Sequence, residues 1–160
     1  TITSRVRKTM ETQLVLALSH ERVNVPDTWD IGSAVAFGKS CLDRASSLEL
    51  PITIMVRHLG RTVFAAGLPG SSSNNDNWAM RKIRLVELFE KSSILLKLEH
   101  EADGVSVYDR HSISELEYAA AGGALPLRNS SGVVGVVAIS GLDQWSDHVF
   151  CVDALTAFNG

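Results

Sequence analysis

The segment ALPLRNSSGVVGVVAIS, residues 124–140, decides the fold, because it contains two strand-forming runs and the turn between them. Residues 133–140 are apolar on both faces, which predicts a strand in the centre of a sheet. Pro126 cannot donate a backbone hydrogen bond, so its strand belongs at an edge or at a bulge. Two strands joined by so short a turn pair antiparallel.

A second hairpin is predicted upstream. Residues 52–56 alternate between apolar and polar, Gly60 suits a tight turn, and residues 62–66 form the returning strand. The pattern also predicts a short strand at 94–98 and irregular chain over 99–114.

The remaining apolar residues recur at helical spacing and predict several helices. These cover about residues 4–18, 28–46, 77–91 and 146–158, with a helical turn at 114–121. Because hairpins replace repeated βαβ units, we predict one α/β (α+β) domain over residues 1–160. It consists of an antiparallel sheet of about five strands with helices packed on it.

Composition excludes several classes of partner. The chain has 160 residues and a net charge of −3 at pH 7, which argues against a nucleic-acid-binding protein. No stretch approaches the ~20 apolar residues that span a bilayer, and no secretory signal pattern is visible. We therefore expect a cytoplasmic protein without a membrane or nucleic-acid partner. Cys41 and Cys151 lie in apolar helical stretches and are expected to be core residues.

Common catalytic motifs are missing from the sequence. The loop GLPGSSS at 67–73 lacks the Gly-Lys-Ser/Thr ending of a phosphate-binding loop, which excludes a nucleotide hydrolase. No Gly-x-Ser-x-Gly elbow occurs. A cation could be bound by four residues of one charged stretch, although a solvated surface is the favoured interpretation: His100, Asp103, Asp109 and His111.

Three segments are more specific. They are GLPGSSSNNDNWAMRK at 67–82, EYAAAGG at 117–123, and Ser-Gly-Leu followed by Asp147-His148 at 140–148. In this order and spacing they resemble the cytoplasmic branch of the GlcG-like haem-degrading domain family, over about residues 14–158. The resemblance implies a profilin-like fold with a five-stranded antiparallel sheet flanked by helices. It also implies a homo-oligomer, and haem as a ligand or substrate.

One position departs from the family pattern. Ala121 precedes the paired glycines, where the family usually has a histidine. If that histidine ligates a metal or transfers protons in relatives, this chain lacks the group, and the expectation of haem degradation weakens.

Asp147 and His148 begin the last predicted helix. The helix dipole stabilises the carboxylate and favours the neutral imidazole, which is the form that ligates a metal. We therefore consider His148 as a metal ligand and Asp147 as a ligand-binding residue. A helix cap or a subunit contact is an equally weighted alternative.

A second candidate cleft lies on the predicted helix at 77–91. Trp78 and Arg81 are three residues apart and share a face, and with Lys82 they could hold the carboxylates of a porphyrin or another small anionic ligand. Core packing of the tryptophan with intersubunit salt bridges is the favoured alternative. Further hydrogen bonds to the ligand could come from Ser92, Ser93 and Tyr118.

Two functional classes remain open, with a third of lower weight. The first is a domain that binds haem or a related small anionic ligand. The second is a homo-oligomeric interaction module without catalysis, favoured by Ala121 and by the absence of an acid–base dyad. The third is a small-molecule sensor of the PAS or profilin type. We expect an oligomeric domain of the GlcG-like type, with haem as a candidate ligand.

Overall fold

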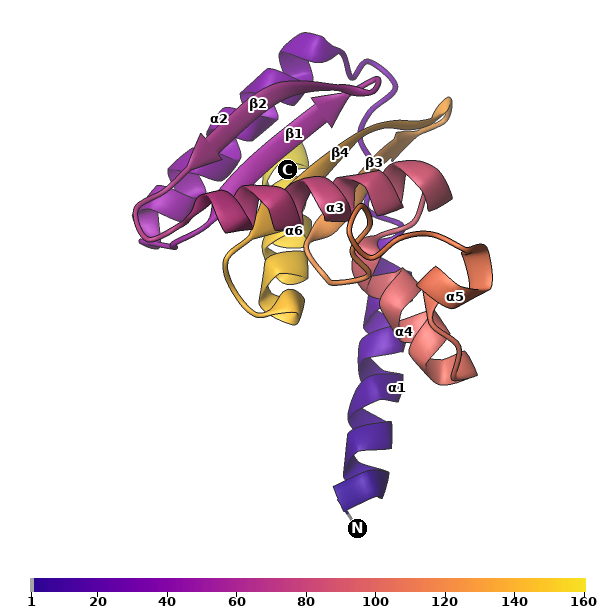
Figure 1. The fold of residues 1–160 in the computed structure, drawn as a ribbon. Helices are drawn as coiled ribbons and strands as arrows, with labels where there is room; N and C mark the ends of the chain where they lie inside the picture. The colour runs from indigo at the N-terminus through magenta and orange to yellow at the C-terminus, as the bar shows by residue number, and fades with distance from the viewer. Residues whose placement is uncertain (1) are drawn as a thin grey trace.

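A four-stranded antiparallel sheet forms the centre of the molecule (Figure 1). The computed structural model describes residues 2–160. The strands lie in the order β2-β1-β4-β3. Their bounds are Thr53–His58 for β1, Arg61–Gly67 for β2, Ala124–Asn129 for β3 and Gly132–Ser140 for β4.

The two hairpins form as the sequence predicts. Strand β4 pairs with β1 from Thr53 opposite Ser140 to His58 opposite Gly135, and with β3 on its other side. The central place of β4 agrees with its apolar residues on both faces. Strand β3, which contains Pro126, lies at the edge of the sheet.

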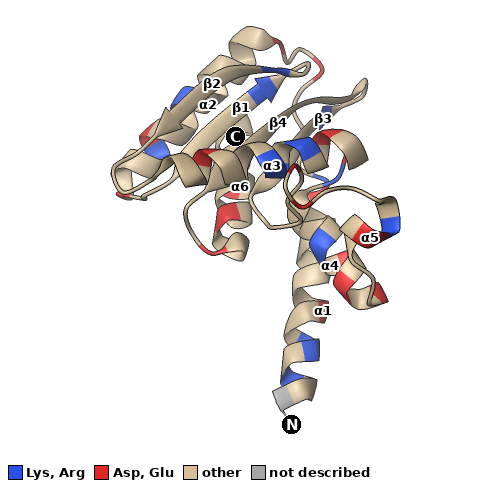
Figure 2. Ribbon diagram, in the orientation of Figure 1, with Lys and Arg blue, Asp and Glu red and all other residues tan. Residues whose placement is uncertain are grey.

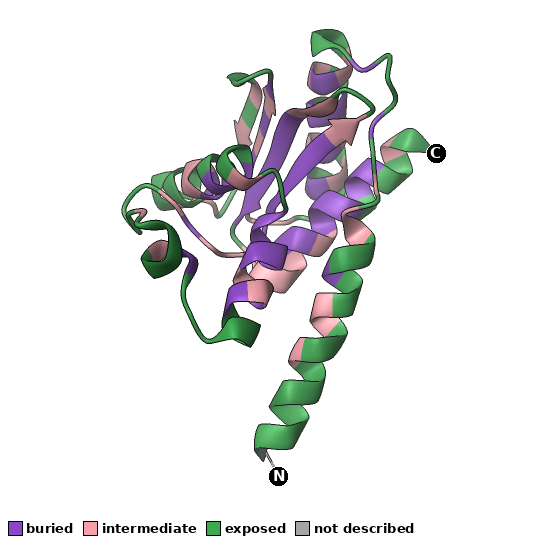
Figure 3. Cartoon of the chain, turned by 90° about the vertical axis from the view of Figure 1, so that its right-hand side faces the viewer, coloured by how far each residue is buried: buried purple, intermediate pink, exposed green. Residues whose placement is uncertain are grey.

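Helices cover both faces of the sheet. Helices α2 (Ile31–Ser47) and α6 (Gln144–Asn159) pack on one face, around Phe37, Ile54, Ile139 and Leu155. Helix α3 (Ser73–Phe89) covers the other face through the apolar cluster of Ala79, Ile83, Val86, Val136 and Ala138. The buried residues form a continuous layer through the sheet and the inner faces of these helices (Figure 3).

Three helices lie to one side of the sheet. Helix α1 (Ile2–His20) packs through Leu14 and Ala17 against α4 (Ser93–Asp103), and its N-terminal part extends away from the body (Figures 1 and 3). The short helix α5 (Val107–His111) follows α4. Within the described residues, no helix is long and apolar enough to cross a membrane.

Two predictions about this region are wrong. The sheet has four strands rather than five, because the predicted strand at 94–98 belongs to α4. Ser92 caps this helix, since its hydroxyl accepts a hydrogen bond from the backbone N–H of Leu95. A short apolar run fits a strand or a buried helix equally, and the cap decides between them. The stretch at 99–114 also contains the end of α4 and all of α5.

Helix α2 approaches the sheet closely at Gly38. A Cβ atom at this position would lie 2.3 Å from Cγ of Phe64 on β2. The glycine that lowers helix propensity in the sequence therefore permits the packing of α2 on the hairpin.

We expect Gly38→Ala to lower the free energy of unfolding by about 1–3 kcal/mol, although alanine is the better helix former. Urea denaturation would measure the change. Lys39→Ala at the exposed neighbouring position serves as the control and should stay within about 0.5 kcal/mol of the parent. A Gly38→Ala protein as stable as the parent would contradict the close approach of α2.

Candidate functional site

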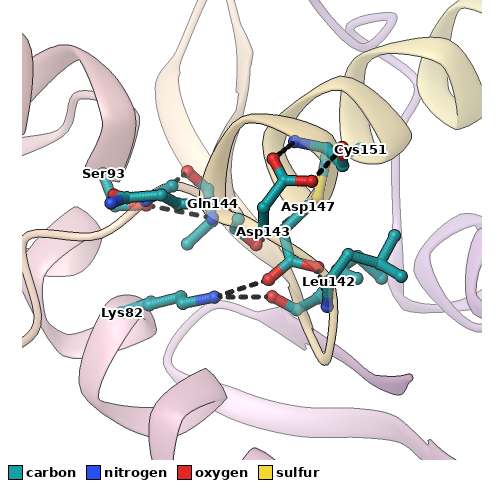
Figure 4. Close-up of polar contacts among 12 residues, drawn as sticks. Lys82, Ser93, Leu142, Asp143, Gln144, Asp147 and Cys151 are labelled. Carbon is teal, nitrogen blue, oxygen red and sulfur yellow. Dashed lines mark hydrogen bonds and ion pairs between the residues drawn. The ribbon is translucent and has the colours of Figure 1, made fainter. Parts of the chain in front are cut away.

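A buried ion pair joins α3 to the start of α6. The ammonium of Lys82 lies 3.1 Å from Oδ2 of Asp147, and the two side chains are 3% and 2% exposed. Figure 4 shows the contact between Lys82 and Asp147. The same ammonium donates to the carbonyl oxygen of Ile139 at 2.9 Å, near the end of β4. The other carboxylate oxygen of Asp147 accepts from the backbone N–H of Leu142 at 3.0 Å. This one pair of side chains therefore joins α3 to the end of β4 and to the start of α6.

Burial and pairing act on Asp147 in opposite directions. Burial raises the pKa of its carboxyl group above the usual range, while Lys82 and the backbone N–H of Leu142 counteract this rise. Asp147 also lies in the first turn of α6, where the helix dipole favours a negative charge. The partners that favour the charged form thus offset part of the cost of the lost hydration, and burial remains the larger effect on the pKa of Asp147.

The paired glycines pass directly over this ion pair. A Cβ atom on Gly123, whose φ is +126°, would lie 2.5 Å from the carbonyl oxygen of Ile139 and 2.7 Å from Nζ of Lys82. A Cβ atom on Gly122 would lie 2.1 Å from the carbonyl oxygen of Gln144. The segments 67–82, 117–123 and 140–148, which are far apart in the sequence, therefore meet around one buried contact.

A pocket of about 280 Å³ opens beside the ion pair, between the first turns of α3 and α6. Ten residues line it: Asn74, Asn75, Trp78, Lys82, Ala121, Ser140, Gly141, Leu142, Gln144 and Asp147. Three of the residues predicted to bind a ligand, Trp78, Lys82 and Asp147, thus come together here.

Trp78 lines this pocket, whereas Arg81 does not line it and instead lies over the Trp78 ring. The guanidinium of Arg81 lies 4.4 Å from the centre of the Trp78 ring, and Trp78 is 36% exposed. Arg81 also donates to the backbone oxygen of Glu115, which ties the chain before the paired glycines to α3. The i,i+3 pairing predicted from the sequence is present, and Trp78 is not a core residue.

Three other candidates do not line the pocket: Ser92 and Ser93 are buried and Tyr118 is half-buried. Ser92 caps α4, and the hydroxyl of Ser93 accepts a hydrogen bond from the backbone N–H of Ala124 at 3.1 Å, so that both serines are fully buried. Tyr118 packs against the cluster of Leu85, Leu96 and Val107.

His148 lies on a different side of α6 from the pocket. Its side chain has no exposed surface, and its Nε2 atom is 2.9 Å from Nδ1 of His20 at the end of α1. The ring also lies against Trp145, at 5.4 Å between ring centres. Burial and the nearby His20 lower the pKa of His148 to about 3, so the imidazole is neutral at physiological pH.

The neutral form agrees with the prediction for His148, but its surroundings do not fit a haem-iron ligand in this structure. A fully buried ring offers no face to an iron centre. The volume of the pocket beside Lys82 is slightly below the range for drug-sized ligands, about 300–1,000 Å³, and is small for a porphyrin. Across residues 2–160, no group of three or more His, Cys, Asp or Glu side chains is arranged to hold a metal ion.

Sequence reasoning missed the amide side chains of the pocket. Asn74, Asn75 and Gln144 all lie in the first turns of helices. The available signals were the helix caps: Ser72 forms a capping box with Asn75, and Asp143 caps α6. The caps at Ser72 and Asp143 mark where α3 and α6 begin, and the side chains of the first turn of each helix follow directly after these caps.

Comparison with known proteins places the chain in a family. Residues 30–156 match the sequence model of the family described as "Haem degrading protein HbpS-like". The chain belongs to this HbpS-like family. The resemblance to GlcG-like domains is thereby confirmed.

Relatives of similar length belong to the UPF0303 group. A UPF0303 protein of Streptomyces avermitilis is 37% identical over 145 residues, which cover 89% of this chain and 88% of the relative. One from Azotobacter vinelandii is 36% identical over 129 residues, covering 80% and 78%.

Several solved structures share the fold. The Ybr137w protein superimposes with a TM-score of 0.81 at 25% identity, covering 91% of this chain and 87% of that chain. HbpS gives a TM-score of 0.66 at 15% identity, covering 82% and 90%. A crystal structure described as a PduOC:haem complex gives 0.67 at 17% identity, covering 83% and 95%.

Loss of the ion pair should be costly. We expect Lys82→Met to lower the free energy of unfolding by about 3–5 kcal/mol, because Asp147 is left buried without its counter-ion. Adding Asp147→Asn should recover much of this loss, since the amide oxygen still accepts from Leu142. The exposed Lys91 pairs with Glu99 and gives the control Lys91→Met, expected to change stability by less than about 1 kcal/mol. Urea denaturation of the three variants measures these changes. Equal effects of Lys82→Met and Lys91→Met would contradict a special role of the buried ion pair in stability.

His148 should make stability depend on pH. Its pKa is about 3 in the folded protein and 6.5 in the reference state, so the unfolded chain binds the extra proton between these values. The contribution of neutral His148 to the free energy of unfolding is complete above pH 6.5 and is lost as the pH falls toward 3. In this range the free energy of unfolding changes by up to about 1.4 kcal/mol per pH unit. We expect His148→Phe to reduce this slope and His111→Ala, an exposed histidine, to leave it unchanged. An unaltered slope in His148→Phe, measured by denaturation across this range, would show that other groups carry the effect.

Proposed function

We propose that the domain binds a small anionic ligand in the pocket between α3 and α6. The observation that carries this proposal is the convergence of two helix N-termini on one pocket that also contains Lys82. Helix starts carry partial positive charge and unpaired N–H groups, which bind carboxylates and phosphates.

The pocket supplies groups of complementary chemistry to such a ligand. The amides of Asn74, Asn75 and Gln144 can donate hydrogen bonds, and the ammonium of Lys82 has three N–H groups, of which the described contacts use two. Trp78 adds a partly exposed aromatic ring to the lining. A volume of about 280 Å³ suits a ligand smaller than a porphyrin.

Haem remains linked to this chain through its family. The family is described as haem-degrading, and one solved relative in fold is a haem complex. Ala121 lines the pocket, so this position provides no imidazole there. These observations favour binding of a small anion over haem turnover at this pocket.

A second role, as a homo-oligomeric module, is favoured by α1. Val15, Leu16 and Leu18 are exposed, while Leu14 and Ala17 pack inward, so this part of the helix is apolar on all sides. Such a helix is normally covered, and an isolated projecting helix is only marginally stable in water.

A second copy of the chain could cover the apolar part of α1. Arg5, Arg7 and Lys8 gather toward the free end of α1 (Figure 2), whereas the acidic side chains of α4 are paired within the same chain: Glu99 with Lys91, Glu101 with Lys97 and Asp103 with Arg110. We propose that α1 packs against another subunit. Light scattering should then give a multiple of the chain mass.

Ligand binding is tested with inorganic phosphate and succinate as probes. Either anion should shift the indole resonance of Trp78 and the amide resonances of residues 74, 75 and 144 in NMR spectra. Ala121→Phe should fill the pocket and abolish these shifts, whereas Trp145→Phe, outside the pocket, should preserve them. Unchanged spectra with both anions, or equal binding by Ala121→Phe, would refute the proposal.

A haemin titration followed by absorbance forms the second arm. We expect no saturable Soret shift at the pocket. A saturable shift at one site per subunit that Ala121→Phe removes would instead assign the pocket to haem. His148→Ala should leave any Soret shift unchanged, because the parent side chain is buried.

A further inference from the structure

His100 has a ring nitrogen that no described contact uses. Its Nδ1 atom lies 2.7 Å from the backbone oxygen of Leu96, one helical turn earlier. A carbonyl oxygen can only accept, so Nδ1 carries the hydrogen and Nε2 holds the lone pair. The side chain is 8% exposed, and Nε2 is buried without a hydrogen-bond partner among the described residues.

This arrangement is typical of a metal-ligating histidine. Such residues commonly donate their second ring N–H to a backbone carbonyl, which fixes the tautomer and the ring orientation before the metal binds. A buried acceptor without a partner is otherwise destabilising. The contact with Leu96 therefore leaves Nε2 of His100 prepared for a ligand.

A second imidazole lies next to His100. The ring centre of His111, the last residue of α5, is 5.8 Å away at an interplanar angle of 68°. Two imidazoles bound to one ion at 2.0–2.1 Å have ring centres roughly 5–6 Å apart. His111 is exposed and its other neighbour is Phe89, at 4.7 Å between ring centres, so His111 can adjust while His100 stays fixed in α4.

We propose that Nε2 of His100 and the imidazole of His111 bind one divalent transition-metal ion. Imidazole ligands favour ions such as Ni²⁺, Cu²⁺ and Zn²⁺. Within residues 2–160 no third His, Cys, Asp or Glu completes a ligand group, so water fills the remaining positions. Two acidic side chains of α4 are engaged elsewhere: Asp103 pairs with Arg110 and Glu101 with Lys97.

A second close pair, His20 and His148, leaves neither of its facing nitrogens without a partner. Nε2 of His148 and Nδ1 of His20 face each other at 2.9 Å and are joined by a hydrogen bond. Their facing nitrogens are therefore satisfied by one another, and this pair serves as an internal control.

The test is a calorimetric titration of Ni²⁺ into tag-free, full-length protein. We expect one ion per chain, and binding weakened about tenfold or more in His111→Ala and in His100→Phe. His111→Ala removes an exposed side chain, so it tests the site even if His100→Phe unfolds. His20→Ala should bind as the parent protein does.

Spectroscopy with Cu²⁺ identifies the ligands independently. The electron paramagnetic resonance spectrum should show coupling to two nitrogens in the parent and to one in His111→Ala. Parent-like Ni²⁺ affinity in His111→Ala, or a loss confined to His20→Ala, would overturn the proposal, as would an absence of Ni²⁺ binding by the parent protein.

Discussion

The buried contact between Lys82 and Asp147 is the constraint on which the rest of the structure depends. Two charges removed from water are tolerated only when each has well-placed partners. Here the partners come from the end of β4, through Ile139, and from the start of α6, through Leu142. The ion pair therefore fixes the relative positions of α3, β4 and α6, and the glycine at position 123 is required because no side chain fits above it.

The same constraint builds the pocket. Because Asp147 holds the first turn of α6 against α3, two helix N-termini lie side by side with Lys82 between them. The specificity of the motif segments thus has a physical origin in packing. Their residues form a small polar pocket because the buried ion pair holds α3 against α6. His20 and His148, which contact each other, do not line this pocket.

Much of the sheet was predictable from sequence, because alternation and turn residues act locally: β1, β2, β3 and β4 lie where the pattern places them. The strand predicted at 94–98 failed, since a short apolar run does not distinguish a strand from a buried helix and the cap at Ser92 decides the outcome. In the site, Trp78, Lys82 and Asp147 were each predicted to bind a ligand, but Asp147 was assigned to a different candidate site from the other two. The ion pair between Lys82 and Asp147 was not predicted, because their partnership spans 65 residues and depends on tertiary packing.

Position 121 separates the structural role of the motif from its chemical role. Gly122 and Gly123 cannot change without displacing the backbone or the ion pair. Ala121, the residue before them, lines the pocket, so its side chain can vary while Lys82 and Asp147 stay in place. A larger or ionisable residue here would change the lining of the pocket and leave the buried ion pair in place. The buried contact between Lys82 and Asp147 therefore does not depend on the side chain at position 121, and the alanine in this chain leaves the pocket between α3 and α6 open.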